Sequence, residues 1–196
     1  MSSSKDALIT TSIQESIKLK QALLADKDLL NQISDVIKEF VSALGSGHKI
    51  LLFGNGGSAA DAQHIAAEFV GRFQMERTPL PALALTVNTS ALTGIGNDYA
   101  YENVFSRQIE ALGSAGDVAV GISTSGKSPN VLKGLAVAKA KGLVTVALTG
   151  KFGSMLKEVS RYCLCVPSDQ TPRIQESHIL IGHIVSQVTE LEMFAK

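Results

Sequence analysis

The sequence predicts an α/β fold, a three-layer αβα sandwich with a parallel sheet and an N-terminal helical extension. From residue 48 onward, short apolar runs alternate with helical stretches, which is typical of a parallel sheet covered on both faces. Residues 8–45 instead place apolar side chains at three- and four-residue spacing, which indicates helices. Because no linker or repeat interrupts the chain, we expect one domain, with helices in 1–47 and the αβα core in 48–196.

Each element is predicted from its local pattern. The extension contains two helical segments, "ALITTSIQESIKLKQALL" and "KDLLNQISDVIKEFVSALGSG", and the closing "GSG" suits a helix C-cap. The apolar runs predict strands at 49–54, 81–86, 117–123, 143–150 and 162–167. The stretches between and after them predict helices at 58–72, 89–112 with a break near "GND", 129–141, 153–158 and 173–195.

The composition excludes several classes of protein. Of the 196 residues, 45% are hydrophobic and 18% are charged, which is typical of a globular domain. Eighteen basic residues balance eighteen acidic ones, so the net charge favours neither nucleic acid nor an anionic membrane as a partner. No apolar run is long enough for a membrane span, and the amino terminus has no secretory signal pattern. We therefore expect a cytoplasmic protein.

The two cysteines, Cys163 and Cys165, are separated by one residue of the last predicted strand. This spacing puts both side chains on one face of a strand. Two cysteines alone make a poor zinc site, and adjacent same-face positions on one strand are unfavourable for a disulfide. We therefore expect both to be simple buried strand residues.

The first candidate binding loop is "FGNGGSAAD", which contains Asn55, Gly56 and Gly57 between a strand and a helix. Ligands of open α/β sheets bind beyond the carboxyl ends of the strands, where such turns lie. The glycines permit close backbone approach, and the free N–H groups of the helix start can bind an anion. The loop matches neither the dinucleotide-binding glycine pattern nor the Walker A motif. A polar ligand loop and a tight turn without a ligand both remain open.

The second candidate loop is "GISTSGKSPN", in which Ser123, Thr124, Ser125 and Ser128 gather around a glycine. Hydroxyl groups at a helix start can surround a phosphate with short neutral donors. An ordinary N-cap would explain one of these hydroxyls and leave the others unexplained. We therefore favour a phosphate loop, in which Lys127 either contacts the phosphate or faces solvent.

Two helices carry residues that could hold a metal ion. His64 and Glu68 are four positions apart and share one helix face, although an exposed pair of this kind is common without a metal. Gln175 and His183 lie on roughly one face of the last helix, about 12 Å apart along its axis. If both bind one ion, either Gln175 lies in an irregular first turn or the two come from different subunits. His178 points elsewhere and is expected to be structural.

Five segments together closely resemble the phosphoheptose isomerases of the SIS domain superfamily: "GNGGSAADAQHIAAEF", "GND", "GDVAVGISTSGKSPNVL", "ALTG" and "RIQESHILIGHIV". The resemblance covers essentially the whole chain. It implies a three-layer αβα sandwich, a homotetramer, and active sites shared between subunits. It also implies conversion of sedoheptulose 7-phosphate to D-glycero-D-manno-heptose 7-phosphate, which supplies heptose for lipopolysaccharide or other surface glycans.

The resemblance also implies roles for individual residues. One zinc ion per subunit would be held by His64, Glu68, Gln175 and His183, and Glu68 and His183 would be the catalytic acid/base pair. The implied substrate contacts are Asn55, Gly56, Gly57, Glu68, Asn97, Asp98, Ser123, Thr124, Ser125, Ser128 and Gln175. Aldose–ketose isomerisation moves a proton between C1 and C2, and a carboxylate and an imidazole are suitable groups for that transfer. Asp61 is a candidate for orienting a substrate hydroxyl or assisting ring opening.

Two other functions are compatible with the same fold. A non-catalytic SIS paralogue that binds the bacterial replication initiator would accommodate the loops and "FQMERTPLPALAL", but it has no need of Glu68 and His183. A sugar-phosphate sensor would normally carry a DNA-binding domain, and this chain has neither room for one nor a basic patch. The isomerase is therefore the favoured hypothesis.

Overall fold

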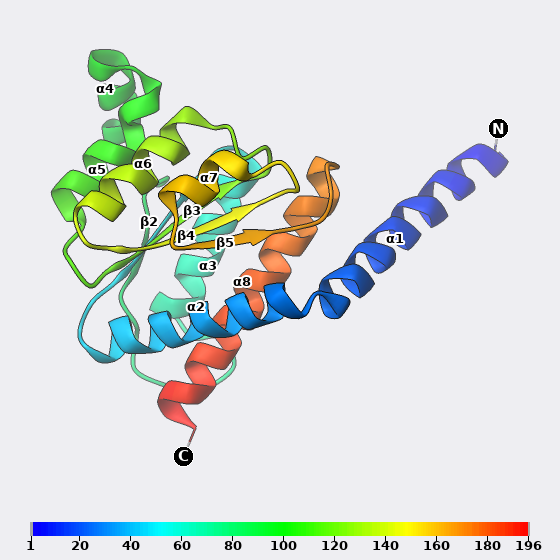
Figure 1. Cartoon of the computed structure of the whole chain (residues 1–196), viewed down its shortest axis with the longest axis horizontal. Coiled ribbons are helices and arrows are strands. Elements are labelled where there is room, and N and C mark those ends of the chain that lie inside the picture. The colour runs from blue at the N-terminus through cyan, green and yellow to red at the C-terminus, as the bar shows by residue number, and fades with distance from the viewer. Residues whose placement is uncertain (1, 196) are drawn as a thin grey trace.

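The computed structural model describes residues 2–195, which form three layers around a parallel sheet, as the sequence predicts (Figure 1). The strand order is β2-β1-β3-β4-β5, and every neighbouring pair is parallel. The strands are β1 (Ile50–Gly54), β2 (Ala82–Ala84), β3 (Val118–Ser123), β4 (Val144–Thr149) and β5 (Tyr162–Cys165). Each lies within its predicted range and is somewhat shorter.

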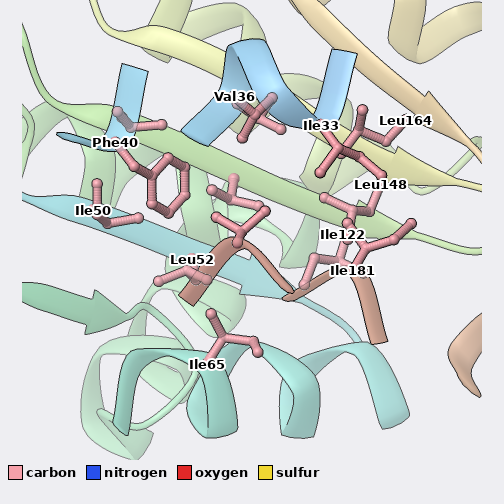
Figure 2. Packing of buried hydrophobic residues seen from close by; sticks show 14 of the residues in the cluster. Ile33, Val36, Phe40, Ile50, Leu52, Ile65, Ile122, Leu148, Leu164 and Ile181 are labelled. Carbon is pink, nitrogen blue, oxygen red and sulfur yellow. The ribbon is translucent and has the colours of Figure 1, made fainter. Parts of the chain in front are cut away.

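Alternation along the strands divides the interior into two cores. Ile50 and Leu52 of β1 face one side, where α2 (Lys27–Gly45), α3 (Gly57–Val70) and α8 (Thr171–Phe194) cover the sheet. Figure 2 shows side chains of these helices packed against that face. Leu51 and Phe53 face the other side, which α5 (Val104–Leu112), α6 (Pro129–Ala140) and α7 (Ser154–Val159) cover.

The predicted helix 89–112 is interrupted at Ala100, two residues after "GND", which confirms the predicted break near this motif. Ala100 has a φ of 72°, a left-handed conformation that an α-helix cannot continue through. The segment therefore divides into α4 (Thr89–Tyr99), the short 3₁₀ helix η1 (Tyr101–Asn103) and α5. In Figure 1, α4 stands beyond α5 and α6, at the outer end of that layer.

Helix α1 (Ser2–Ala25) projects from the body of the protein (Figure 1). Its base is joined to α8 by a 2.7 Å hydrogen bond from the Ser16 hydroxyl to Glu176. Farther out, Leu8, Ile9 and Ile13 are each more than half exposed. A row of exposed apolar side chains on a projecting helix is typical of a surface that packs against another protein chain. Within residues 2–195, no helix is long and apolar enough to cross a membrane.

The prediction that Cys163 and Cys165 are buried is wrong. Both lie on β5, which is an edge strand, and both are only half-buried. Their Sγ atoms are 3.6 Å apart on one face, as the two-residue spacing predicts, and both thiols are free. The apolar pattern of β5 could not reveal that this strand lies at the edge of the sheet and pairs with β4 on one side.

Candidate active site

Helices α3 and α8 pack side by side and run in the same direction from the carboxyl edge of the sheet. Near their starts, the side chain of Gln175 lies so close to Gly57 that a Cβ there would be 2.3 Å from its Nε2. About two turns further on, a Cβ at Gly182 would lie 2.4 Å from Ile65 Cδ1. Both glycines therefore permit a close approach, and a larger residue at either position would have to displace the side chain opposite it.

This packing brings three predicted metal ligands together. Nε2 of His64 lies 3.0 Å from Oε1 of Glu68 and 3.1 Å from Nε2 of His183. One donor atom from each residue lies within 4.8 Å of the other two. Neighbouring ligands of a tetrahedral zinc ion, bound at about 2.0–2.2 Å, are separated by about 3.4 Å. The imidazole and carboxylate donors and their spacing therefore fit a zinc ion, with His64 on the exposed side.

Gln175, the fourth predicted ligand, does not join this group within one chain. Helix α8 is continuous from Thr171 to Phe194, so Gln175 lies in a regular turn and the irregular first turn is absent. Eight residues of helix separate it from His183 by about 12 Å along the axis. Its side chain lies instead against Gly57, at the start of the first candidate loop.

The first candidate loop is fixed by two asparagines. Asn55 and Asn130 exchange two 2.9 Å hydrogen bonds between their side-chain amides, and the Tyr101 hydroxyl donates to Asn55 Oδ1 at 3.3 Å. Asn130 lies at the buried start of α6, so this pair connects the turns that follow β1 and β3. Gly56 has a φ of 56°, which favours glycine at this position. The Asn130 side chain was not among the predicted site residues, although it closes the second candidate motif.

The second candidate loop brings its hydroxyls to the start of α6. Ser123 and Ser128 hydrogen-bond each other at 2.9 Å, so Ser128 does not cap α6 with its side chain although it occupies the N-cap position. Ser125 is exposed and accepts a 3.3 Å hydrogen bond from the backbone N–H of Lys127. Thr124 is half-buried, and the Lys127 side chain is exposed. Pro129 has no N–H group, and the N–H groups of Val131 and Leu132 are bonded to the Ser128 carbonyl oxygen. The hydroxyl groups are therefore the main donors that this loop offers to an anion.

Asn97 and Asp98 lie apart from the rest of the candidate site. Both are exposed on α4, where Asn97 Nδ2 donates to Asp98 Oδ1 at 2.8 Å. Within residues 2–195, no hydrogen bond joins either side chain to the two candidate loops or to the His64–Glu68–His183 group. Their predicted role as substrate contacts stays a prediction.

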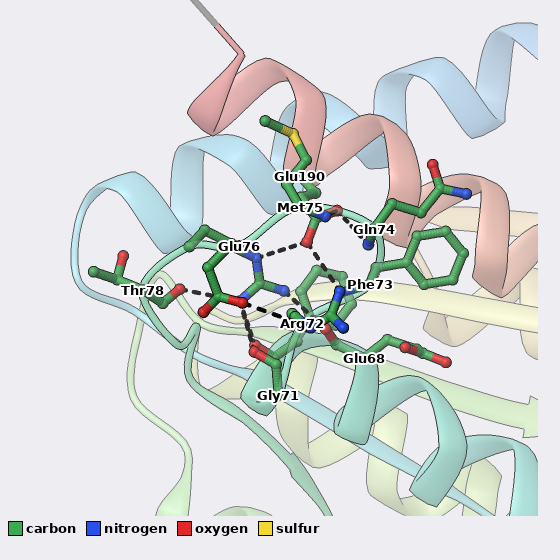
Figure 3. Close-up of polar contacts among 11 residues, drawn as sticks. Glu68, Gly71, Arg72, Phe73, Gln74, Met75, Glu76, Thr78 and Glu190 are labelled. Atoms are coloured by element: carbon green, nitrogen blue, oxygen red, sulfur yellow. Dashed lines mark hydrogen bonds and ion pairs between the residues drawn. The ribbon is translucent and has the colours of Figure 1, made fainter.

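A buried ion pair, which the sequence patterns did not predict, connects α8 to the segment after α3. Figure 3 shows the Glu190 carboxylate accepting hydrogen bonds from the backbone N–H groups of Phe73, Gln74 and Met75, at 3.0, 2.7 and 2.9 Å. Arg77 Nε donates to it at 2.9 Å, and each side chain is 2% exposed. Burial alone would raise the pKa of Glu190, but these four donors outweigh it and the pKa is lowered.

The remaining Arg77 donors hold the end of α3. Its guanidinium donates to the carbonyl oxygens of Glu68 at 2.8 Å, Phe69 at 2.9 Å and Thr78 at 3.0 Å. Glu190 is seven residues, or two helical turns, beyond His183 on α8. The Arg77–Glu190 pair therefore connects the helix that carries Glu68 to the helix that carries His183, about two helical turns from the His64–Glu68–His183 group.

Behind the group, Asp61 and His178 line an apolar cavity of about 30 Å³ between α3, α8 and the sheet. His178 is 1% exposed, and neither ring nitrogen makes a well-formed hydrogen bond. Burial lowers its pKa to about 4, against a weaker opposing effect of the Thr149 carbonyl. Burial also raises the pKa of Asp61 to about 6, and the nearby His64 only partly opposes this. His178 thus lies in the core, as expected of a structural histidine.

The low pKa of His178 predicts a loss of stability in acid. Between pH 6.5 and about 4, the unfolded chain binds a proton that the folded protein does not, so stability falls as the pH is lowered through this range. His178→Leu should remove this contribution, and the wild-type and variant unfolding free energies should therefore diverge with pH. Urea unfolding with chelator present, at a series of pH values, measures the difference. A constant difference between pH 7 and 4 would contradict the prediction.

The described fold and site define a SIS-type αβα protein whose loops suit a sugar phosphate. The SIS domain family profile matches residues 14–150. The chain is 54% identical over 186 residues to phosphoheptose isomerase of Aneurinibacillus thermoaerophilus, covering 95% of this chain and 94% of the relative. It belongs to the phosphoheptose isomerase family of SIS domain proteins.

Solved structures agree with this assignment. The phosphoheptose isomerase of Neisseria gonorrhoeae superposes with a TM-score of 0.87 at 43% identity, over 94% of this chain and 98% of that one. That of Francisella tularensis gives a TM-score of 0.90 at 36% identity, over 94% and 97%. These similarities do not favour the initiator-binding paralogue.

Proposed function

We propose that this protein interconverts sedoheptulose 7-phosphate and D-glycero-D-manno-heptose 7-phosphate, for heptose or other surface glycan biosynthesis. The observation that carries the proposal is the grouping of Glu68 with His64 and His183, because a carboxylate and imidazoles beside a sugar-phosphate loop suit aldose–ketose chemistry. The relatives named phosphoheptose isomerase at 54% and 53% identity support the same reaction.

In the proposed reaction, Glu68 removes a proton from C1 of the ketose and His183 delivers a proton to C2. The C1–H electrons form the enediol double bond, and the hydroxyl proton of C1 leaves while the oxygen on C2 is protonated. The imidazole of His183 is suited to this role because histidine is the most common general acid in enzymes. The two residues end with their protonation states exchanged, and solvent restores them.

We propose that His64, Glu68 and His183 also hold a zinc ion, since their donor types and spacing fit a tetrahedral site. Bound zinc would polarise the carbonyl group and stabilise negative charge on the oxygens of the enediol. Glu68 and His183 then serve both as ligands and as proton carriers, which is consistent if their coordination loosens when substrate binds.

The polar loops would hold the rest of the substrate. We propose that Asn55, Gly56 and Gly57 contact the hydroxyl groups of the substrate, while its phosphate lies against the hydroxyls of the Ser123–Ser128 loop at the start of α6. Asn97 and Asp98 are exposed on α4 and would reach the substrate from a neighbouring subunit.

We also propose a homotetramer with active sites shared between subunits. The exposed apolar residues of α1 offer a surface for assembly. Gln175 lies about 12 Å from His183 along α8, too far to join the His64–Glu68–His183 group of its own chain. Gln175 of one subunit would then be the fourth ligand beside His64, Glu68 and His183 of another subunit. Sedimentation velocity should give the mass of four chains.

Mixing two inactive variants tests the shared site. Gln175→Ala and His183→Gln chains are each expected to be inactive alone, whereas co-expressed mixed assemblies should regain part of the wild-type activity. Sites that take Gln175 from one variant and His183 from the other are intact, because each chain supplies what its partner lacks. If both residues serve within one chain, no mixed site is intact and activity stays lost.

The direct test of the proposed function is turnover. Purified protein supplied with zinc should convert sedoheptulose 7-phosphate to the aldose, followed by a reducing-sugar assay or by NMR of the aldose C1 proton. Absence of turnover in folded, zinc-loaded protein would reject the isomerase in favour of a binding protein. Metal analysis of protein purified without chelator gives the zinc content, which we expect to approach one ion per chain.

A further inference from the structure

A surface hollow of about 450 Å³ opens at the β5 edge of the sheet, away from the candidate active site. One wall is formed by Cys163 and Cys165 of β5 with Lys157 and Arg161 beside them, and the other by the start of α2. On that opposite wall, the Asp26 carboxylate is engaged by the backbone N–H of Leu29, as the cap of α2. The proposed isomerase chemistry uses none of these residues.

The two thiols in this hollow differ in their surroundings although they touch. A thiol–thiol hydrogen bond joins their Sγ atoms at 3.6 Å. This bond lowers the pKa of Cys165, with burial opposing it and the positive charge of Lys157 helping. The same bond, with burial, raises the pKa of Cys163. These directions make Cys165 the more readily ionised thiol of the pair, while the positive charge of Lys157 favours ionisation of either sulfur.

We propose that Cys163 and Cys165 form a reversible, peroxide-reactive thiol pair, with Cys165 as the attacking sulfur and Cys163 as the resolving one. Reactive redox cysteines are solvent-accessible, lie near cations and stand next to a second thiol, and this pair combines all three features. The ligand class is a small hydroperoxide, which the hollow is large enough to admit.

The proposed reaction balances in two steps. The Cys165 thiolate attacks one peroxide oxygen, the O–O bond breaks, and the sulfur loses two electrons to become a sulfenic acid while the other oxygen leaves as an alcohol or water. The Cys163 sulfur then attacks the Cys165 sulfur and forms an S–S bond. The S–O bond breaks, and the hydroxyl group leaves with the Cys163 proton as water.

The strand geometry predicts that this disulfide is easily reduced. Two residues of extended strand span about 6.6 Å between Cα atoms, near the upper limit of about 6.8 Å that a disulfide tolerates. Closing the bond must therefore bend β5, and bent, exposed disulfides are the labile ones. The edge position helps, because β5 has a strand neighbour on one side only.

Peroxide treatment of the native protein tests the proposal. Because the chain has two cysteines, thiol counts and intact mass are unambiguous. Hydrogen peroxide should remove both free thiols and two hydrogen atoms from the mass of a single chain, and a mild dithiol should restore them. Cys163→Ser should stop at a sulfenic acid that dimedone traps on Cys165, whereas Cys165→Ser should react no faster than the urea-unfolded chain.

Two lysine variants test whether nearby positive charge speeds the reaction of Cys165. Lys157→Met should slow the reaction of Cys165 by about threefold or more, because it removes the nearby positive charge, whereas Lys38→Met on the exposed face of α2 should leave the rate unchanged. The proposal is overturned if the native thiols react no faster than those of the unfolded chain. Equal reactivity of the two single-serine variants, or disulfides that form only between chains, would overturn it as well.

Discussion

Glu68→Gln is expected to lower kcat for sedoheptulose 7-phosphate by about 10²–10⁴-fold, the usual contribution of a positioned general base. Glutamine keeps the size of the side chain and a carbonyl oxygen 3.0 Å from His64, but it cannot accept a proton from C1. Because the substitution leaves the phosphate loop untouched, KM should change far less than kcat. Steady-state kinetics on folded, zinc-supplemented protein measures both constants.

His183→Gln should give a loss of similar size, because the amide can hydrogen-bond but cannot deliver a proton to C2. The matched controls are Glu76→Gln and His48→Gln. Glu76 is 92% exposed, and His48 lies beside Asp117. Both controls should retain wild-type kcat within about twofold. A Glu68→Gln variant that kept most of its activity would remove Glu68 as the base, whatever its zinc content.

The zinc content of the Glu68 and His183 variants distinguishes a role as zinc ligand from a role in proton transfer. If Glu68 and His183 act only as ligands, added zinc should restore activity to each variant in proportion to the metal bound. If they also carry protons, activity should stay low when the zinc content matches that of wild type. Exchange of the substrate C1 proton with deuterated solvent gives a second test of these roles. If Glu68 is the base, the Glu68→Gln variant should not exchange this proton.

Much of the fold follows from local patterns. Apolar runs predicted the five strands of the described sheet. The reason is clearest for β1, β3 and β4, because a strand covered on both faces must be apolar along its length. The pairing of His64 with Glu68 was predictable because four residues make slightly more than one helical turn. The arrival of His183 at the same group was not, because it depends on the parallel packing of α3 and α8, which brings Gly182 against the Ile65 side chain.

The features that the sequence did not reveal depend on distant contacts. Arg77 and Glu190 are 113 positions apart, and neither lies in a periodic pattern that separates it from ordinary surface charge. Charged residues are mostly exposed, so their burial could not be predicted without knowing that the two helices meet. The burial of the two cysteines differs from the prediction for a similar reason. The apolar sequence of β5 does not indicate that this strand lies at the edge of the sheet.

Arg77→Met is expected to lower the free energy of unfolding by about 3–5 kcal/mol, since removing one partner of a buried ion pair leaves an uncompensated charge. The Glu190 carboxylate would keep its backbone N–H donors but lose the positive charge that faces it. The carbonyl oxygens of Glu68 and Phe69 would lose the hydrogen bonds that the guanidinium donates to them. Urea unfolding at pH 7 with chelator measures the change. At low pH, protonation of Glu190 should narrow the difference, because the lowered pKa makes the wild-type pair lose stability in acid.

Arg72→Met is the matched control in the same loop. Among the described residues, the ion pair of Arg72 is an exposed one with Glu76, at 3.7 Å, so its loss should cost less than about 1 kcal/mol. If the Arg77–Glu190 pair positions the active site as well as stabilising the fold, Arg77→Met should also weaken zinc binding at temperatures where it is fully folded. Normal zinc affinity in the folded variant would restrict the pair to stability. A stability loss no larger than that of Arg72→Met would show that the pair contributes little to fastening α3 to α8.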